Sequence, residues 1–195
     1  MPLIVDHVQR RAELVEVTWR VIAQFGFERA TMRQICAAAG YANGALKPYF
    51  PTKEDLLEAT FEYVFERTTT RIHEEVGDST GREALEAFAE QVLPLDELRQ
   101  DEARVVIPFW QRALHNEEEQ AVNREKMSSW QKMLHGWFMD EGLAEETAVS
   151  AGHTFLTFLL GTQVTTALNQ EGTEEQTLRE HTRFMLDVLL RTGKA

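Results

Sequence analysis

The chain of 195 residues has few of the features that mark several classes of protein. Its single cysteine, Cys36, excludes a framework of intrachain disulfides and is typical of a reducing compartment. No apolar run approaches the roughly 18 residues that a membrane span needs. Residues 1–11 lack the core of a signal peptide because Asp6 and His7 interrupt them. We therefore expect a cytoplasmic protein that has no membrane-spanning segment.

Enzyme and metal-site motifs are also missing. The sequence has no Gly-rich phosphate loop and no Gly-x-Ser-x-Gly, His-Glu-x-x-His or Cys-x-x-Cys. None of the six histidines follows a glutamate by three residues, as the ligands of a di-iron bundle would. His115 with Glu118 and Glu119 could bind a metal, but a solvated helix start explains these residues equally well. We predict no catalysis, no metal and no cofactor.

A helical period runs through the chain, and no stretch alternates in the manner of a strand. Residue pairs with capping-box spacing stand at four proposed helix starts, which are Thr31/Gln34, Thr52/Asp55, Thr80/Glu83 and Thr173/Gln176. The sequence therefore predicts an all-α fold of about nine helices, near residues 5–25, 32–39, 43–50, 53–75, 81–94, 96–115, 117–141, 144–169 and 173–191.

The stretch from Thr31 to Lys53 predicts a helix-turn-helix. Ile35 and Cys36 lie on the apolar face of its first helix, and Gly40 supplies a left-handed turn. A second helix is expected over residues 43–50, where Leu46 and Phe50 would pack inward. The second helix of such a pair can enter the major groove of DNA.

This stretch resembles the DNA-binding segment of the TetR family of one-component bacterial transcription regulators. The residues that carry the resemblance are Gly26, Thr31-Met32-Arg33, Ala38-Ala39-Gly40, Gly44-Ala45-Leu46, Tyr49-Phe50 and Lys53-Glu54. It covers about the first 60 residues. The family implies an N-terminal three-helix DNA-binding bundle, at 1–53, and a C-terminal helical bundle for ligand binding and dimerisation, at 54–195.

The residues expected to contact DNA come from both arguments. Asn43, Gly44 and Lys47 would lie on the face opposite Leu46, although Asn43 could also serve only as a helix cap. The resemblance adds phosphate contacts from Thr31 and other residues. The predicted set is Thr31, Arg33, Tyr41, Asn43, Gly44, Ala45, Lys47, Tyr49 and Lys53.

Two residues depart from the usual family pattern. Lys47 stands where tyrosine is common, and Pro48 follows it. Because proline removes an amide donor and crowds the preceding turn, we expect the last turn of this helix to be distorted. The sequence preference of better-known members therefore cannot be transferred to this chain.

The net charge of −12 divides unevenly along the chain. Residues 1–53 hold seven basic and four acidic side chains, a balance of +3, so the rest carries −15. The pattern favours a cationic DNA-binding head on an acidic body. A balance of +3 can also describe a mildly basic surface, and an all-α interaction module that has lost DNA binding stays an alternative.

The C-terminal half predicts a dimer interface and a ligand pocket. Residues 144–169 are apolar on nearly all sides, which implies burial against both their own chain and a partner. The expected homodimer uses 144–169 and 173–191, with Leu156 and Leu160 at the interface. The candidate pocket residues are Phe109, Trp110, His115, Met127, Trp130, Gln131, Met133, His135, Trp137, His153 and Gln163, each of which could instead simply fill the core.

The sequence around Trp110 loosely resembles a C-terminal subgroup that includes choline-responsive repressors, and an aromatic cage would suit a quaternary amine. Together these features predict a repressor that binds double-stranded operator DNA as a homodimer. An unidentified small-molecule effector would release it by favouring a conformation that fits DNA less well.

Overall fold

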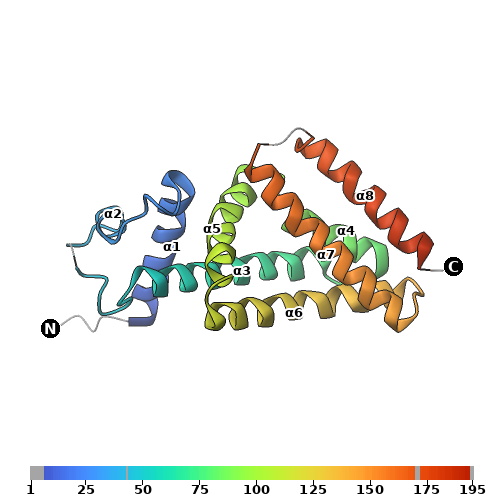
Figure 1. Cartoon of the computed structure of the whole chain (residues 1–195), viewed down its shortest axis with the longest axis horizontal. Coiled ribbons are helices and arrows are strands. Elements are labelled where there is room, and N and C mark those ends of the chain that lie inside the picture. The colour runs from blue at the N-terminus through green and yellow to red at the C-terminus, as the bar shows by residue number, and fades with distance from the viewer. Residues whose placement is uncertain (1–6, 43, 170–171, 194–195) are drawn as a thin grey trace.

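The structure is a computed structural model that describes residues 7–42, 44–169 and 172–193. These residues form eight α-helices and no strand (Figure 1), so the predicted all-α class is confirmed. The helices are α1 (His7–Phe25), α2 (Met32–Ala38), α3 (Lys53–Val76), α4 (Gly81–Val92), α5 (Glu97–Ala113), α6 (Glu117–Asp140), α7 (Glu145–Ala167) and α8 (Glu175–Thr192).

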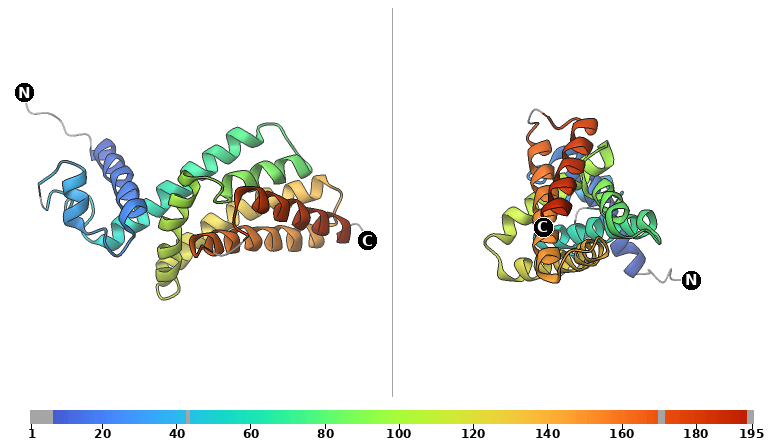
Figure 2. Two further views of the ribbon diagram at one scale, coloured as in Figure 1. Left: turned by 90° about the horizontal axis from the view of Figure 1, so that it is seen from above. Right: turned by 90° about the vertical axis from the view of Figure 1, so that its right-hand side faces the viewer.

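The molecule is elongated, with α1 and α2 at one end and α8 toward the other (Figures 1 and 2). Helix α3 runs from the small end into the larger bundle and contributes to two hydrophobic cores. Its first half, including Phe61, packs with α1, α2 and part of α5, whereas Ile72 and Val76 pack with α4, α6, α7 and α8. The small end is therefore joined to the bundle by a continuous helix, and the boundary at residue 53 stays a prediction.

The four predicted capping boxes have different outcomes. Those at Thr31 and Thr52 are confirmed, because each threonine accepts from the backbone three residues on and the third side chain accepts in return. Thr80 is the N-cap of α4 but makes no side-chain cap bond. The carboxylate of Glu141 accepts instead from the Arg82 amide at 2.8 Å. The box at Thr173 is wrong, since α8 begins at Glu175 after an N-cap at Glu174.

The predicted helix at 43–50 is also wrong over its described part. Residues 44–49 form successive turns rather than an α-helix. Gly44 has a φ of +90°, which a right-handed helix does not allow. Pro48 cannot donate to the backbone, and the amides of Lys47 and Tyr49 reach carbonyls three residues back rather than four. This segment accounts for the difference between eight helices and the expected nine.

Helix α8 is attached to α4 by charged hydrogen bonds. Arg179 donates through two nitrogens to the carboxylate of Glu90, at 2.8 Å each. Arg82 donates at 2.6 Å to Asp187. The hydrogen bond to Glu90 raises the pKa of Arg179, and a bond to Glu86 does the same for the pKa of Arg82. These links fix which side of α8 faces away from its own chain.

Candidate nucleic-acid interface and ligand cavity

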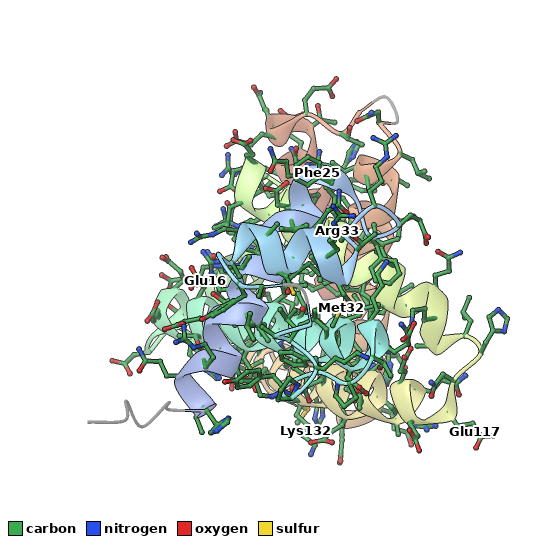
Figure 3. The ribbon with its side chains drawn as sticks, turned by 90° about the vertical axis from the view of Figure 1, so that its left-hand side faces the viewer. Glu16, Phe25, Met32, Arg33, Glu117 and Lys132 are labelled. Carbon is green, nitrogen blue, oxygen red and sulfur yellow. The ribbon has the colours of Figure 1, made fainter. Side chains whose placement is uncertain are left out.

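The helix-turn-helix region lies at the free end of the molecule, and Figure 3 looks onto that end. The first turn of α2 starts at the exposed cap Thr31, and Arg33 in that turn is exposed as well. The free N–H groups of a helix start and a nearby guanidinium suit a phosphate. Gly40, with a φ of +73°, then turns the chain away from α2.

The segment after the turn presents short and cationic groups to solvent although it is not a helix. Gly44 and Lys47 are exposed, and Ala45 and Tyr49 are half-buried. Leu46 and Phe50 are fully buried in the N-terminal core and anchor the segment, whereas Asn43 lies outside the described residues. A buried anchor at each end of an exposed lysine gives this turn segment a defined surface without helical hydrogen bonding.

Tyr41 and Lys53, which are among the predicted DNA contacts, have partners elsewhere in the chain. The hydroxyl of Tyr41 accepts from Arg10, whose guanidinium carbon lies 4.9 Å from the Tyr41 ring centroid. The Lys53 ammonium donates to the Phe27 carbonyl at 2.8 Å and lies 4.0 Å from the Phe27 ring centroid. Lys53 therefore attaches the start of α3 to the connection between α1 and α2, and its remaining N–H groups are free for phosphate.

The C-terminal bundle contains a cavity of about 520 Å³ that is widely open to solvent, between the end of α5, the first half of α6 and the second half of α7. Its mouth includes Leu114, which is 71% exposed. The volume lies within the range of small-molecule sites in proteins. The lining residues are Trp110, Ala113, Leu114, Gln120, Asn123, Met127, Thr157, Leu160, Gly161 and Val164.

A second, much smaller cavity of about 30 Å³ lies directly beside the first, and Trp110, Met127 and Leu160 line both. Its wall carries a buried ion pair. The Arg71 guanidinium donates to both carboxylate oxygens of Glu102, at 2.8 and 2.7 Å.

Four of the predicted pocket residues line these cavities, namely Trp110, Met127, Trp130 and Gln163. Phe109 does not, because it lies in the N-terminal core and stacks on Phe61 with 3.8 Å between ring centroids. His115 is exposed beside a separate cleft near the connection between α1 and α2.

The remaining five predicted pocket residues lie elsewhere in the bundle. Gln131 and His153 form a hydrogen bond of 2.9 Å between α6 and α7 at the surface. Met133 and Trp137 pack against the bundle core, and His135 is half-buried. The sequence reasoning missed Gln120, Asn123 and a stripe on α7 at positions 157, 160, 161 and 164, whose helical spacing was the available signal.

In the described part of the chain, no three His, Cys, Asp or Glu side chains gather as a metal site would require. Nor is any helix there long and apolar enough to cross a bilayer.

Burial, followed by the nearby carboxylates of Glu62 and Glu119, raises the pKa of Glu58 on α3. Arg112 of α5 contacts two carboxylates of this region, those of Glu119 and Glu54.

A helix-turn-helix region on one end of a helical bundle that holds a cavity defines a class, the ligand-responsive DNA-binding regulators. Residues 14–60 match the family model of bacterial regulatory proteins of the tetR family, and residues 81–191 match that of the C-terminal part of BetI-type transcriptional repressors. The chain belongs to the TetR family of bacterial transcription regulators. The resemblance found in the sequence is thereby confirmed.

Several relatives support this assignment. The regulator PksA of Bacillus subtilis is 31% identical over 149 residues, which are 76% of this chain and 73% of PksA. The regulator BetI of Yersinia pestis is 27% identical over 119 residues, and the match spans only 60% of the length of each protein. Both relatives are transcriptional regulators, in agreement with the two family models.

Solved structures agree on the fold. A transcriptional regulator from Rhodococcus sp. Rha1 superposes with a TM-score of 0.84 at 22% identity, over 95% of this chain and 98% of the other. A regulator from Saccharomonospora viridis, crystallised in complex with choline, has a TM-score of 0.84 at 19% identity, over 92% and 96%. At such identities the likeness shows the shared architecture alone.

Proposed function

We propose that this regulator represses transcription as a homodimer that binds a pseudo-palindromic operator, and that a small molecule in the 520 Å³ cavity releases it. The observation that carries the proposal is the placement of the exposed helix-turn-helix region at the end of the molecule farthest from the acidic bundle (Figure 2). Its DNA contacts are the predicted set, with Arg33 and Lys47 as the exposed cations. No catalytic role is proposed.

Two features support release by a ligand. The cavity wall at Ala113 and Leu114 is continuous with Arg112, which contacts Glu54 in the first turn of α3. The adjacent Lys53 holds the connection between α1 and α2. A ligand that moves the end of α5 would therefore shift the DNA-binding end, provided that it binds the two conformations with different affinity. The choline complex of the Saccharomonospora viridis regulator supports a small molecule as effector.

Operator binding is tested by fluorescence anisotropy with labelled DNA from upstream of the protein's own gene. We expect tight, sequence-dependent binding of two protomers per site, with half-sites about one helical turn apart. A scrambled duplex of equal length is the control. Equal, weak binding of both duplexes and of further genomic fragments would instead favour the alternative, an all-α interaction module that has lost DNA binding. The absence of an α-helix at 44–49 favours the same alternative.

Lys47→Ala is expected to weaken operator binding and to reduce the slope of log K against log salt by about one unit, because one phosphate contact is lost. The measurement is a salt series with the native operator. Lys132→Ala removes another exposed lysine, from α6 in the bundle, and should leave the slope unchanged. A slope that Lys47→Ala does not alter would remove the phosphate contact from the proposal.

A further inference from the structure

The chemistry of the cavity wall identifies the class of ligand that the bundle can hold. Of the described residues that line the 520 Å³ cavity, none carries a charge. Only three, Gln120, Asn123 and Thr157, have polar side chains. An ion in this open cavity would lose its water over the face that contacts the wall, and no opposite charge on the wall would compensate that desolvation cost. The wall itself therefore opposes a charged ligand.

The carboxylate that borders the adjoining small cavity is already neutralised. Glu102 borders the small adjoining cavity and is 5% exposed, but both of its oxygens accept from Arg71. Thr68 adds a hydrogen bond of 3.3 Å to the same carboxylate. A cationic ligand would have to displace a two-pronged guanidinium contact, which is among the stronger side-chain interactions in proteins.

The aromatic rings near the cavities do not form a cage for a cation either. A face of Phe65 stacks on Trp130 with 4.7 Å between centroids, and the Lys126 ammonium lies 5.5 Å from the same ring. Phe61 stacks on Phe109. Only Trp110 among the aromatic residues lines the large cavity. A quaternary ammonium group needs several open ring faces, which these pairs do not offer.

A hydrogen-bonding group is nevertheless available at one end. The indole N–H of Trp110 donates to Asn123 Oδ1 at 3.1 Å. Since an indole nitrogen can only donate, this bond fixes the orientation of the Asn123 amide. The NH₂ group of Asn123 is thereby left as a donor at the cavity wall, where a carbonyl or hydroxyl oxygen of a ligand would accept from it.

We infer that the cavity takes an uncharged, largely apolar molecule with an acceptor oxygen positioned against Asn123, in preference to a cation or an anion of the same size. The inference rests on the proposed function only in naming this cavity as the effector site. It departs from the quaternary amine that the loose resemblance to the choline-responsive subgroup suggests.

The test compares three ligands that share one ring system and differ in charge, namely naphthalene-2-carboxamide, naphthalene-2-carboxylate and 2-naphthylmethylammonium. Isothermal titration calorimetry with the whole protein, without DNA, measures each affinity at neutral pH. We expect the amide to bind at least about tenfold more tightly than either ion. An ion that binds as tightly as the amide overturns the inference, and so does the absence of binding by all three up to about 1 mM.

The variant Asn123→Asp tests whether the ligands bind against the cavity wall at this residue. The substituted side chain keeps the oxygen that accepts from Trp110 but replaces the NH₂ donor with a carboxylate oxygen. We expect the ratio of ammonium to amide affinity to rise at least about tenfold. Gln111→Glu places the same charge on exposed α5 surface outside the cavity and should leave the ratio unchanged. A ratio that Asn123→Asp does not change overturns the assigned site.

Failure of the ligand class and failure of the proposed function give different results. If the amide binds but leaves operator affinity unaltered, the inferred class of uncharged ligand is supported, and the proposed role of the cavity ligand as effector is contradicted. If the ammonium compound binds more tightly and releases DNA, the effector role stands and the ligand class falls.

Discussion

Arg71→Met is expected to lower the free energy of unfolding by about 3–5 kcal/mol, because it leaves the Glu102 carboxylate buried without its counter-charge. The two side chains are only 19% and 7% exposed, so water screens them poorly. The contact joins α3 to α5 and borders the small cavity. Urea unfolding at one fixed protein concentration measures the change, since a dimer links stability to concentration.

Two further variants separate the buried charge from loss of packing. The double change Arg71→Met, Glu102→Leu should return to within about 1 kcal/mol of the parent protein, because neither charge then remains inside. Arg20→Met removes the same side chain from an exposed pair with Glu16 on α1 and should cost about 0.5 kcal/mol at most. A similar loss for Arg71→Met and Arg20→Met would show that the α3–α5 pair is not a stabilising buried contact.

Local signals predicted most helix positions. The boxes at Thr31 and Thr52 need only four consecutive residues, so the starts of α2 and α3 were predictable from the sequence. At Thr80 a residue distant in the sequence decided the outcome. Glu141 approaches the first turn of α4 and accepts from it, which replaces the expected side-chain cap. Such a contact across the fold leaves no signal in the local pattern.

The segment at 44–49 shows a local conflict that the sequence did contain. Gly44 permits a positive φ and Pro48 disfavours the preceding helical turn, yet Leu46 and Phe50 have the four-residue spacing of a helical face. The apolar spacing correctly predicted which residues are buried. It did not predict the helix, because two residues that break helices lie within so short a segment.

The cavity was the least predictable feature. The sequence predicts large aromatic and methionine residues as pocket residues, but most of them fill the hydrophobic cores, where their size is needed. The space itself lies where side chains are short, at Ala113, Thr157 and Gly161. Sequence spacing shows which residues share a helix face, whereas an unfilled space depends on how three helices meet.

The proposed dimer interface was also difficult to predict from sequence spacing. Leu156 was expected to meet a partner subunit, but it is 3% exposed within its own chain, and Leu160 lines both cavities. The prediction for Leu156 was wrong, because an all-apolar helix does not reveal which apolar face its own chain covers, whereas that for the half-buried Leu160 stays a prediction. On α8 the distinction is clear, since Leu178, Leu186 and Leu190 face inward while Phe184 is 65% exposed.

Phe184→Glu is therefore expected to convert the proposed dimer into monomers and to weaken operator binding at least about 100-fold, because the link between two half-site contacts is lost. Phe184 lies on the side of α8 opposite its core residues, and a ring so exposed on a predicted interface helix suits burial against the same helix of a second copy. A glutamate there would place two like charges near the symmetry axis. Light scattering should then give a mass near 22.4 kDa instead of twice that value.

The matched control is Met139→Glu, which makes the same type of change at an exposed apolar residue of α6. It should leave both the mass and the operator affinity unchanged. Circular dichroism of both variants checks that the helices remain folded, so that loss of the dimer is not confused with unfolding. If Phe184→Glu still gives a dimer that binds the operator as the parent does, the outer face of α8 is not the interface, and the subunits must meet elsewhere.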